Sequence, residues 1–328
     1  MLNNVNDKTR FGIPSKGRMQ GETMEFFEEC GFKIKRKNRQ YLADLVGFDN
    51  VLMVLQNQED IVRGVIAGNL AFGIVGYDVL LEMADGDKNF IVVHDDLEFG
   101  KCSLEIAVPE NWSENTLEEL QNYKNIRIAS KFPNLTKKFL KNILQNYELV
   151  KAKGAIEVSP ALGMSDVIVD LVSTGQTLAD NRLKRLDNGR LLSSQAVFIG
   201  NKQLLRNPAT LELAQTFLEY FEARIRGKNF VSVFINVRGE NEQIIADKMF
   251  ALPELAGLQG PTISPVISKL PGKWFAVHII VAKKKLPKAI KSLRSIGGSG
   301  LVVTPTSYIF EEEPIQLKKL IDQLEVSS

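Results

Sequence analysis

Between residues 10 and 192, short apolar runs alternate with amphipathic stretches, and this rhythm constrains the fold more than any other feature. Short apolar runs predict buried strands, and apolar residues at helical spacing predict the helices that cover them. Strands are predicted at residues 11–13, 51–55, 71–75, 126–129 and 167–172, and helices at residues 23–30, 60–67, 77–83 and 135–147. This alternation predicts an α/β fold with parallel sheets covered by helices.

The rhythm changes in the last third of the chain. Residues 208–226 predict a long amphipathic helix that begins at Pro208 and ends before Gly227. Strands then follow at residues 231–237, 262–267, 275–281 and 301–309, with helices at residues 241–252 and 286–296. This β-α-β-β-α-β order predicts a ferredoxin-like module. The chain is predicted to cross from one α/β lobe to the other at the polar residues 109–113.

Composition excludes several classes of protein. Hydrophobic residues make up 44% and charged residues 24% of the 328 residues, which are ordinary globular proportions. A net charge of +2 gives no electrostatic reason to expect nucleic acid or an anionic membrane as a partner. Cys30 and Cys102 are too few for a disulfide framework or a zinc motif. The polar N-terminus and the lack of a long apolar run predict a cytoplasmic protein.

The sharpest local signal follows the strand predicted at residues 167–172, which contains Asp170. The next residues are rich in hydroxyl groups and include a glycine, and a helix can begin among them: Ser173, Thr174, Gly175, Gln176 and Thr177. Backbone N–H groups of such a loop converge at a helix N-terminus, which favours a phosphate. The alternative is an N-capped helix with no ligand, because serine and threonine are good caps.

Two cations lie just after the first predicted strand. Lys16 and Arg18 flank Gly17 at the end of a strand where open α/β sheets bind their ligands, so they suit a polyphosphate. A solvated basic turn is the alternative. Asp78 and Glu157 each lie near the start of a predicted helix. Either carboxylate complements the helix dipole, or it contacts a ribose or a base.

The chain lacks the signatures of several other enzyme classes. His94 and His278 are its two histidines, and they lie far apart in sequence, so a Ser-His-Asp triad or a histidine-rich metal site is poorly supported. The Gly-x-Gly-x-x-Gly fingerprint of nicotinamide enzymes and the Walker A spacing are both missing from the sequence.

Taken in order, these motifs resemble the ATP phosphoribosyltransferase family in its long form. The catalytic segments that carry the resemblance are residues 14–18, 76–82, 99–102, 132–136, 154–157 and 170–178. Residues 260–265, 274–278 and 297–302 resemble the family's histidine-sensing domain. The resemblance covers residues 9 to 310, and several motifs in register are far more specific than any one of them.

The resemblance implies two periplasmic-binding-protein-like lobes that form a catalytic cleft, followed by a ferredoxin-like regulatory domain. The implied division is residues 1–103 with 194–227, residues 104–193, residues 228–311, and a tail at residues 312–328. The implied reaction transfers phosphoribosyl from phosphoribosyl pyrophosphate to N1 of ATP, with Mg²⁺, as the first step of histidine synthesis. Histidine is the implied inhibitor, and the implied assembly is a homo-oligomer, from dimer to hexamer.

The resemblance also implies roles for the candidate residues. The loop from Ser173 to Thr177 would hold the 5-phosphate, with Asp170 fixing the geometry. Lys16 and Arg18 would face pyrophosphate or ATP, and Asp78 and Glu157 would contact ribose or adenine. Thr262 and Gly300 match positions that line the histidine site.

Two other functions remain open from the sequence. The first is a binding protein with the same two lobes and no catalysis. The second is a phosphoribosyltransferase that acts on a free base.

Overall fold

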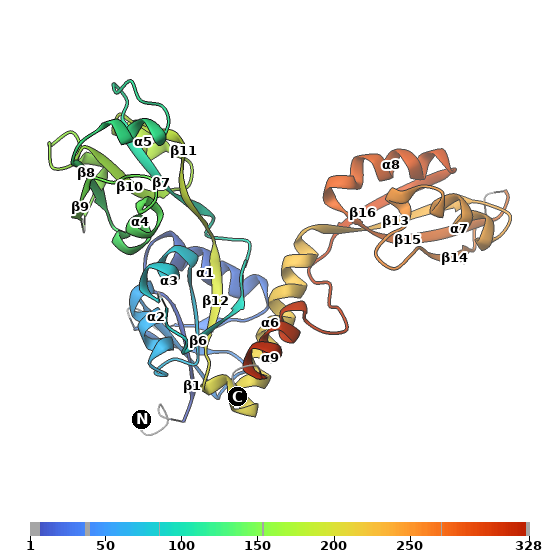
Figure 1. The fold of residues 1–328 in the computed structure, drawn as a ribbon. Helices are drawn as coiled ribbons and strands as arrows, with labels where there is room; N and C mark the ends of the chain where they lie inside the picture. Colours follow the sequence, from blue (N-terminus) through green and yellow to red (C-terminus); the bar gives the residue numbers. More distant parts are fainter. Residues whose placement is uncertain (1–6, 37–39, 85, 153, 270, 326–328) are drawn as a thin grey trace. The chain divides into compact units, whose positions relative to one another are not determined.

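A computed structural model describes residues 7–36, 40–84, 86–152, 154–269 and 271–325. The polar start at residues 1–6 lies outside these ranges. The chain forms two compact units, one of residues 1–216 with 316–328 and the other of residues 217–315. Figure 1 traces the elements of both units along the chain.

The first sheet of the larger unit has seven strands in the order β2-β3-β4-β1-β5-β12-β6. Its centre is parallel, with β1 (Thr9–Pro14) between β4 (Val51–Gln56) and β5 (Phe72–Gly76). The other strands are antiparallel to their neighbours: β2 (Ile34–Lys35), β3 (Leu42–Leu45), β6 (Phe90–His94) and β12 (Ala196–Asn201). Helices α1 (Gly17–Glu29), α2 (Gln58–Ile66) and α3 (Tyr77–Met83) follow β1, β4 and β5, as the apolar periodicity predicts.

The second sheet has five strands in the order β11-β7-β10-β8-β9. Its strands are β7 (Cys102–Pro109), β8 (Ile126–Ser130), β9 (Tyr147–Lys151), β10 (Val167–Val172) and β11 (Leu183–Ser194). Around it lie α4 (Pro133–Leu140), α5 (Gln176–Asp180) and the short 3-10 helices η1 (Glu118–Asn122) and η2 (Ile156–Val158). Two sheets joined by two chain crossings form the two periplasmic-binding-protein-like lobes.

The crossings lie next to each other in space. The chain leaves the first sheet after β6 and enters the second with β7, and it returns through Gln195, which separates β11 from β12. The prediction that the chain crosses between the lobes at residues 109–113 is therefore wrong, because Pro109 is the last residue of β7, inside the second sheet. Polar turn residues occur between any two elements, so they did not identify the crossing.

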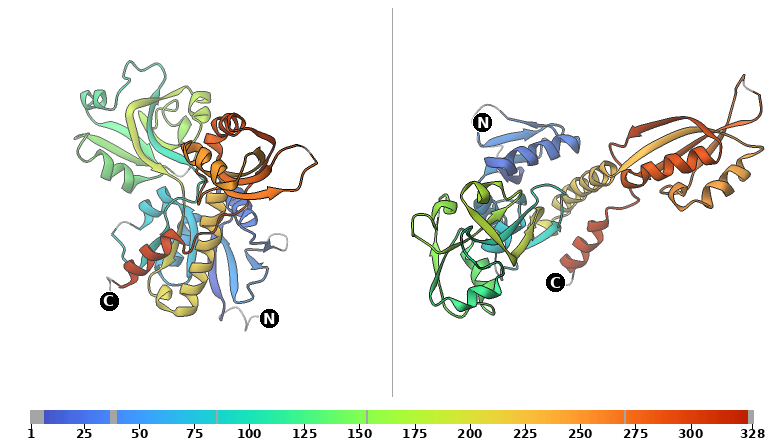
Figure 2. Two further views of the ribbon diagram at one scale, coloured as in Figure 1. Left: turned by 90° about the vertical axis from the view of Figure 1, so that its right-hand side faces the viewer. Right: turned by 90° about the horizontal axis from the view of Figure 1, so that it is seen from above.

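The smaller unit contains the ferredoxin-like fold that the sequence predicts. Strands β13 (Phe230–Arg238), β14 (Thr262–Val266), β15 (Trp274–Ala282) and β16 (Gly298–Pro305) are antiparallel and lie in the order β14-β15-β13-β16. Helices α7 (Glu242–Phe250) and α8 (Leu286–Ser295) share one apolar core with one face of this sheet (Figure 2). Alternate residues of β13 enter this core, as the period of two predicts.

Several predicted boundaries differ from the structure. Helix α6 (Pro208–Lys228) continues through Gly227, where a Cβ atom would lie 2.6 Å from the carbonyl oxygen of Ser307. Close approach, and not a break in the helix, therefore requires this glycine. Helix α4 ends at Leu140, and the apolar residues after it continue into the core through turns. Strand β16 begins at Gly298, three residues before the predicted start.

The tail at residues 312–328 contains a helix, α9 (Ile315–Glu325). Leu317, Leu320 and Leu324 are buried on one face of it. Gln316 onward belongs to the larger unit, so the chain returns to that unit after the ferredoxin-like fold.

Candidate active site

A first polar cluster surrounds the start of α3, directly after β5. Asp78 is only 4% exposed, and its carboxylate accepts a hydrogen bond of 2.5 Å from Ser194 Oγ. The Asp78 backbone N–H in turn donates to Ser194 Oγ at 3.0 Å. Burial raises the pKa of Asp78, and the Ser194 hydrogen bond and the positive charge of Arg18 partly offset this effect.

Arg18 and Cys102 belong to the same cluster. Burial raises the pKa of the Cys102 thiol, and the negative charge of Asp78 raises it further, whereas Arg18 lowers it. Arg18 also pairs with Glu22 at 3.5 Å within α1, and the other Glu22 oxygen accepts the Gly100 N–H at 3.0 Å. The structure therefore brings Arg18 and Asp78 together, as expected for one site. It adds Ser194, which sequence analysis missed because it lies 116 residues away.

Lys16 lines a pocket at the carboxyl ends of β1 and β4. It takes the N-cap position of α1, is exposed, and precedes Gly17, whose φ is +72°. The pocket has a volume of about 590 Å³, and Lys16 and Gly17 line it together with Asn57 and Gln58 at the start of α2. Two helix N-termini and a lysine favour an anion here, although Glu59 and Asp60 also line the pocket.

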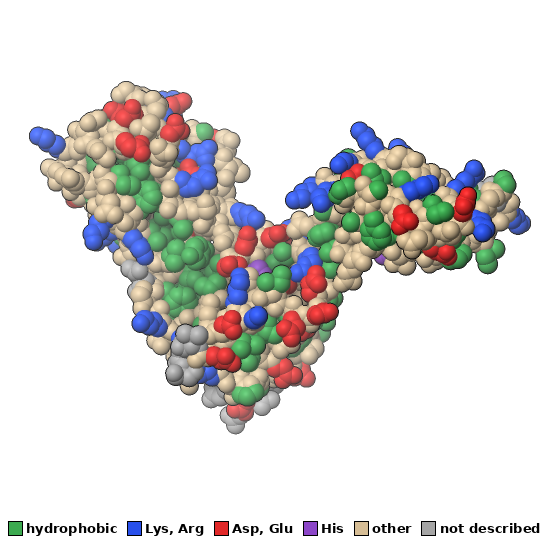
Figure 3. All heavy atoms as spheres, turned by 45° about the vertical axis from the view of Figure 1, so that its right-hand side comes forward, with side chains coloured by type: hydrophobic (Ala, Val, Ile, Leu, Met, Phe, Trp, Pro, Cys, Tyr) green, Lys and Arg blue, Asp and Glu red, His purple; other side chains and the backbone are tan. Residues whose placement is uncertain are grey.

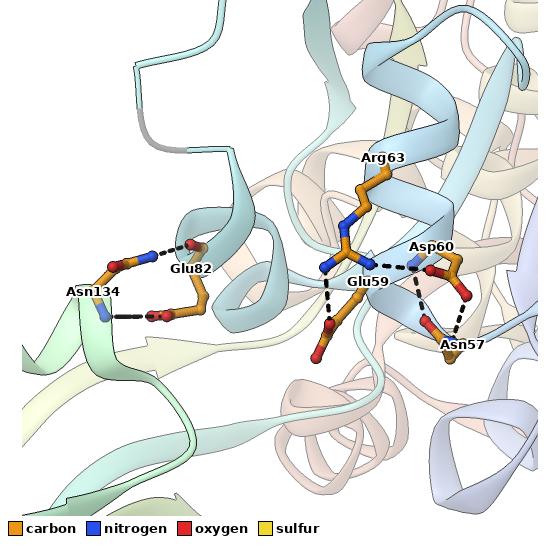
Figure 4. Close-up of polar contacts among 6 residues, drawn as sticks. All are labelled: Asn57, Glu59, Asp60, Arg63, Glu82 and Asn134. Carbon is orange, nitrogen blue, oxygen red and sulfur yellow. Dashed lines mark hydrogen bonds and ion pairs between the residues drawn. The ribbon is translucent and has the colours of Figure 1, made fainter. Parts of the chain in front are cut away.

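The outer side of that pocket carries an ion-paired surface, shown in Figure 4. Arg63 lies 3.3 Å from Glu59 and 3.2 Å from Asp60, and Asn57 caps α2 by accepting the Asp60 N–H at 2.8 Å. All three charged side chains are about half exposed, so these pairs add little stability.

A second polar cluster lies at the end of β10. Asp170 is buried and forms an ion pair of 3.5 Å with Lys131. Burial raises the pKa of Asp170, Lys131 offsets part of that rise, and the negative charge of Glu157 adds to it. Glu157 lies in η2, and its buried Oε2 has no hydrogen-bond partner among the described residues. Because buried polar atoms are normally paired, this oxygen is a candidate acceptor for a ligand donor.

The loop after β10 is open and contains a left-handed glycine. Gly175 has φ +84°, in the left-handed region, and its position is open, with Val172 Cγ1 3.9 Å from an added Cβ atom. Ser173, Thr174 and Thr177 are exposed around it. Gln176 donates through its side chain to Asp180 at 2.7 Å, so this amide supports α5 itself. Helix α5 begins at Gln176, as the sequence predicts, and ends at Asp180.

The two sensor candidates do not meet within one chain. Thr262 is exposed on the edge strand β14, and Gly300, with φ +64°, lies on the opposite edge strand β16. Three strand spacings separate these edges, which corresponds to about 14 Å. Between them, the ring of His278 stacks on Phe234 with centroids 4.3 Å apart, and His278 Nε2 is 2.7 Å from Ser232 Oγ.

Charge and metal-ligating groups are distributed without a strong focus. Basic and acidic side chains are interspersed over the face drawn in Figure 3. Within the described ranges, no group of three or more histidine, cysteine, aspartate or glutamate side chains is placed to hold a metal ion. None of the described helices is long and apolar enough to cross a membrane.

Comparison with known sequences identifies the family. The family model described as ATP phosphoribosyltransferase matches residues 57–223, and the model described as HisG, C-terminal domain, matches residues 228–308. The chain belongs to the ATP phosphoribosyltransferase family. Both matches together confirm the long form predicted from the sequence. The family catalyses a transferase reaction that opens histidine biosynthesis.

Individual relatives share most of the chain. ATP phosphoribosyltransferase 2, chloroplastic, from Arabidopsis thaliana is 36% identical and covers 97% of this chain and 81% of its own. ATP phosphoribosyltransferase from Methanocaldococcus jannaschii is 31% identical and covers 91% of this chain and 99% of its own. Among solved structures, the ATP phosphoribosyl transferase (HisG:HisZ) complex from Thermotoga maritima matches with a TM-score of 0.53 and 25% identity. That match covers 65% of this chain and 96% of the other.

Proposed function

We propose that this chain transfers the phosphoribosyl group of phosphoribosyl pyrophosphate to N1 of ATP, releasing pyrophosphate. The observation that supports this most directly is the left-handed Gly175, in a hydroxyl-rich loop directly after the buried Asp170. This arrangement suits a sugar 5-phosphate, with a carboxylate close enough to orient the ribose. The chain belongs to a family that catalyses this reaction. The loop is the candidate binding site for the phosphoribosyl substrate, which lies between the two lobes in our proposal.

The chemistry requires charge stabilisation more than a strong base. Adenine N1 attacks the anomeric carbon while the bond to pyrophosphate breaks, so positive charge develops on the ribosyl group and negative charge on the leaving group. Preorganised donors aimed at a leaving group commonly contribute about 10²–10³ in rate each. We assign Lys16 and Arg18 to the polyphosphate, since both lie at the N-terminus of α1. The Lys16 pocket suits the phosphates of ATP or pyrophosphate.

The buried carboxylates suit roles in positioning the substrates. Asp170 and Glu157 lie close enough to affect each other electrostatically, and Glu157 Oε2 is available to accept a hydroxyl or amino hydrogen of the substrates. We assign Asp78, held by Ser194 near Arg18, to the ribose or base of ATP. We assign these carboxylates to orienting the substrates, because adenine N1 is the nucleophile of the transfer and no protein nucleophile is needed.

A divalent metal belongs to the family's chemistry, and we propose Mg²⁺. Mg²⁺ keeps several water ligands and usually binds through one or two carboxylates together with substrate phosphates. The described residues fit this mode, because they offer no cage of three metal ligands but place Asp170 and Glu157 beside the phosphate loop. When bound, the metal would neutralise charge on the diphosphate.

Regulation and organisation follow the same family pattern in our proposal. Residues 1–103 with 194–227 and residues 104–193 would form the two catalytic lobes, and residues 228–311 would bind histidine as an inhibitor. Since Thr262 and Gly300 lie on opposite edges of one sheet, a site that uses both would require a second copy of the chain. A homo-oligomer, from dimer to hexamer, and a cytoplasmic location complete the proposal.

One assay separates this function from the two rivals. Purified protein is mixed with ATP, phosphoribosyl pyrophosphate and Mg²⁺, and formation of phosphoribosyl-ATP is followed by its absorbance and mass. We expect product with ATP and none when adenine replaces ATP. Product with adenine alone would identify a free-base transferase, and binding without any product would identify a binding protein.

A further inference from the structure

Strand β11 contains an irregularity that brings two arginines to one carboxylate. Arg185 pairs with Ala107 of β7, and Arg190 pairs with Glu105, so five residues along β11 correspond to only two along β7. The surplus residues form a bulge that includes Asn188 with φ +60°. In a regular strand, side chains five residues apart point to opposite faces. The bulge removes this constraint, and bulges are common next to active sites.

The carboxylate of Glu105 forms ion pairs with both arginines. Its carboxylate is 5% exposed and lies 3.2 Å from Arg190 Nε and 3.5 Å from an Arg185 terminal nitrogen. The arginine side chains are 60% and 50% exposed, so their guanidinium groups face outward. Arg190 uses Nε for Glu105, which leaves its terminal N–H groups for a further partner. Two guanidinium groups over one buried carboxylate carry a net positive charge that suits phosphate oxygens.

The pair lies beside the proposed phosphate loop. Glu105 is the direct cross-strand partner of Asp170, so both side chains lie on the same face of the sheet. Ser103 Oγ connects Glu105 to the loop, because it lies 2.5 Å from Glu105 Oε1 and 3.4 Å from the carbonyl oxygen of Val172. Val172 directly precedes the loop, and α5, which follows it, packs against β11.

We propose that Arg185 and Arg190 form an oxyanion site that binds a phosphate group of the phosphoribosyl substrate next to the Ser173–Thr177 loop. Glu105 is the positioning residue that fixes both guanidinium groups. This inference rests on the proposed function for the identity of the substrate, but not for the existence of the anion site. A backbone loop alone supplies only partial charges, whereas the two arginines together with Glu105 add a net positive charge.

The test uses the full-length protein and three probes in titration calorimetry: phosphoribosyl pyrophosphate, ribose 5-phosphate and pyrophosphate. We expect Arg190→Gln to weaken binding about tenfold or more, as for loss of a charged hydrogen bond, and Arg185→Gln to do so less. Weaker binding of ribose 5-phosphate places the 5-phosphate at the arginines, and weaker binding of pyrophosphate alone places the leaving group there. Either result supports the oxyanion site.

The matched control is Arg127→Gln. Arg127 also pairs with a carboxylate, that of Asp166, at 2.7 Å. This pair lies at the starts of β8 and β10, whereas the loop follows the end of β10. We expect the affinities of this variant to equal those of the wild type. Unchanged affinities for all three probes in both arginine variants would overturn the inference, as would a wild type that binds none of them. Weakened ribose 5-phosphate binding in a protein that makes no phosphoribosyl-ATP would overturn the proposed function alone.

A second measurement tests the role of Glu105. Glu105→Asp keeps the charge but withdraws the carboxylate by one methylene, so the arginines lose their fixed positions. We expect a higher KM for phosphoribosyl pyrophosphate in this variant, with a smaller change in kcat. In an Arg185→Gln, Arg190→Gln background, the same change should have no further effect on KM. An equal effect in both backgrounds would show that Glu105 acts only on the stability of the sheet and would overturn its positioning role.

Discussion

The carboxylate of Glu82, on α3, accepts hydrogen bonds from the backbone N–H of Asn134 at 3.0 Å and of Leu135 at 2.9 Å. Asn134 Nδ2 also donates to the Glu82 carbonyl oxygen at 3.0 Å (Figure 4). These N–H groups belong to the first turn of α4, and the N-cap residue of this helix forms no capping hydrogen bond through its side chain. A residue of the first lobe therefore caps a helix of the second, and this contact connects the two lobes beside both polar clusters.

Loss of this cap should cost stability. We expect Glu82→Ala to lower the free energy of unfolding by about 1–3 kcal/mol, because it leaves part-buried N–H groups without an acceptor. Chemical denaturation would measure the change. The control is Glu59→Ala, which removes a half-exposed ion pair with Arg63 and should cost less than about 1 kcal/mol. Equal losses in the two variants would show that the cap contributes nothing beyond a surface pair.

The buried Asp78 predicts a pH dependence of stability. Its pKa is raised above the ordinary 3.8, so the folded state keeps this proton to higher pH than the unfolded chain. The resulting stabilisation is complete below about pH 4 and is lost as pH rises through the folded-state pKa. Asp78→Asn cannot ionise, so its Tm should rise relative to wild type between about pH 4 and pH 7.

Asp166 provides a control of opposite sign. Arg127 lowers the pKa of Asp166, so its carboxylate stabilises the fold above about pH 4, and this stabilisation is lost as pH falls. The Tm of Asp166→Asn should therefore fall relative to wild type as pH rises toward about pH 4, and the difference should stay constant at higher pH. Parallel Tm curves for wild type and Asp78→Asn would contradict the raised pKa of Asp78.

The phosphate loop depends on Gly175. Gly175→Ala places a Cβ atom on a backbone with φ +84°, which costs about 1–2 kcal/mol and shifts the loop out of its anion-binding geometry. We expect weaker binding of phosphoribosyl pyrophosphate by calorimetry. Gly163→Ala is the matched control, since Gly163 has φ +67° in open space away from the loop. If both variants bind as the wild type does, the loop is not the phosphate site.

Lys16 and Arg18 should affect turnover more than stability. We expect Lys16→Ala and Arg18→Ala each to lower kcat by about 10²–10³ if they stabilise charge on the leaving group. Both side chains lie at the exposed start of α1, so Tm should change little. Lys33→Ala, an exposed lysine of the same lobe, should leave kcat unchanged. Near-normal turnover in both variants would identify the pair as a solvated turn.

The ferredoxin-like unit should carry histidine inhibition. Gly300→Leu adds a bulky side chain where the nearest neighbour of a Cβ atom is Asn236 Nδ2 at 3.9 Å, so there is room for it, although φ +64° costs about 1–2 kcal/mol of backbone strain. We expect inhibition to be lost while uninhibited turnover persists, because allosteric coupling of about 1–3 kcal/mol requires histidine to bind one state better. Gly272→Leu, also at positive φ in open space, should keep inhibition. A wild type that is active but indifferent to millimolar histidine would refute the sensor role.

Local sequence patterns determined many of the strands and helices of this protein. The period of two in β13, the helical period of α2 and α3, and the apolar run of β10 all predict elements that the structure contains, because each depends on neighbours a few residues away. The order of those elements was enough to predict an α/β fold and the ferredoxin-like unit, whereas the two lobes were implied by the resemblance to the family. The motif order was enough to identify the family, which the sequence comparisons confirm.

Only the tertiary structure decided which distant side chains meet. Ser194 reaches Asp78 because β11 returns to the crossing between the sheets, and Glu82 caps α4 because two lobes pack at that point. The bulge that brings Arg185 and Arg190 to Glu105 depends on the register with β7, which no local pattern specifies. Burial that raises the pKa of Asp78 and Asp170 is likewise a property of the packed sheets. The sequence determines local conformation through short-range sterics and periodicity, whereas desolvation and contacts between distant residues arise only once the sheets have formed.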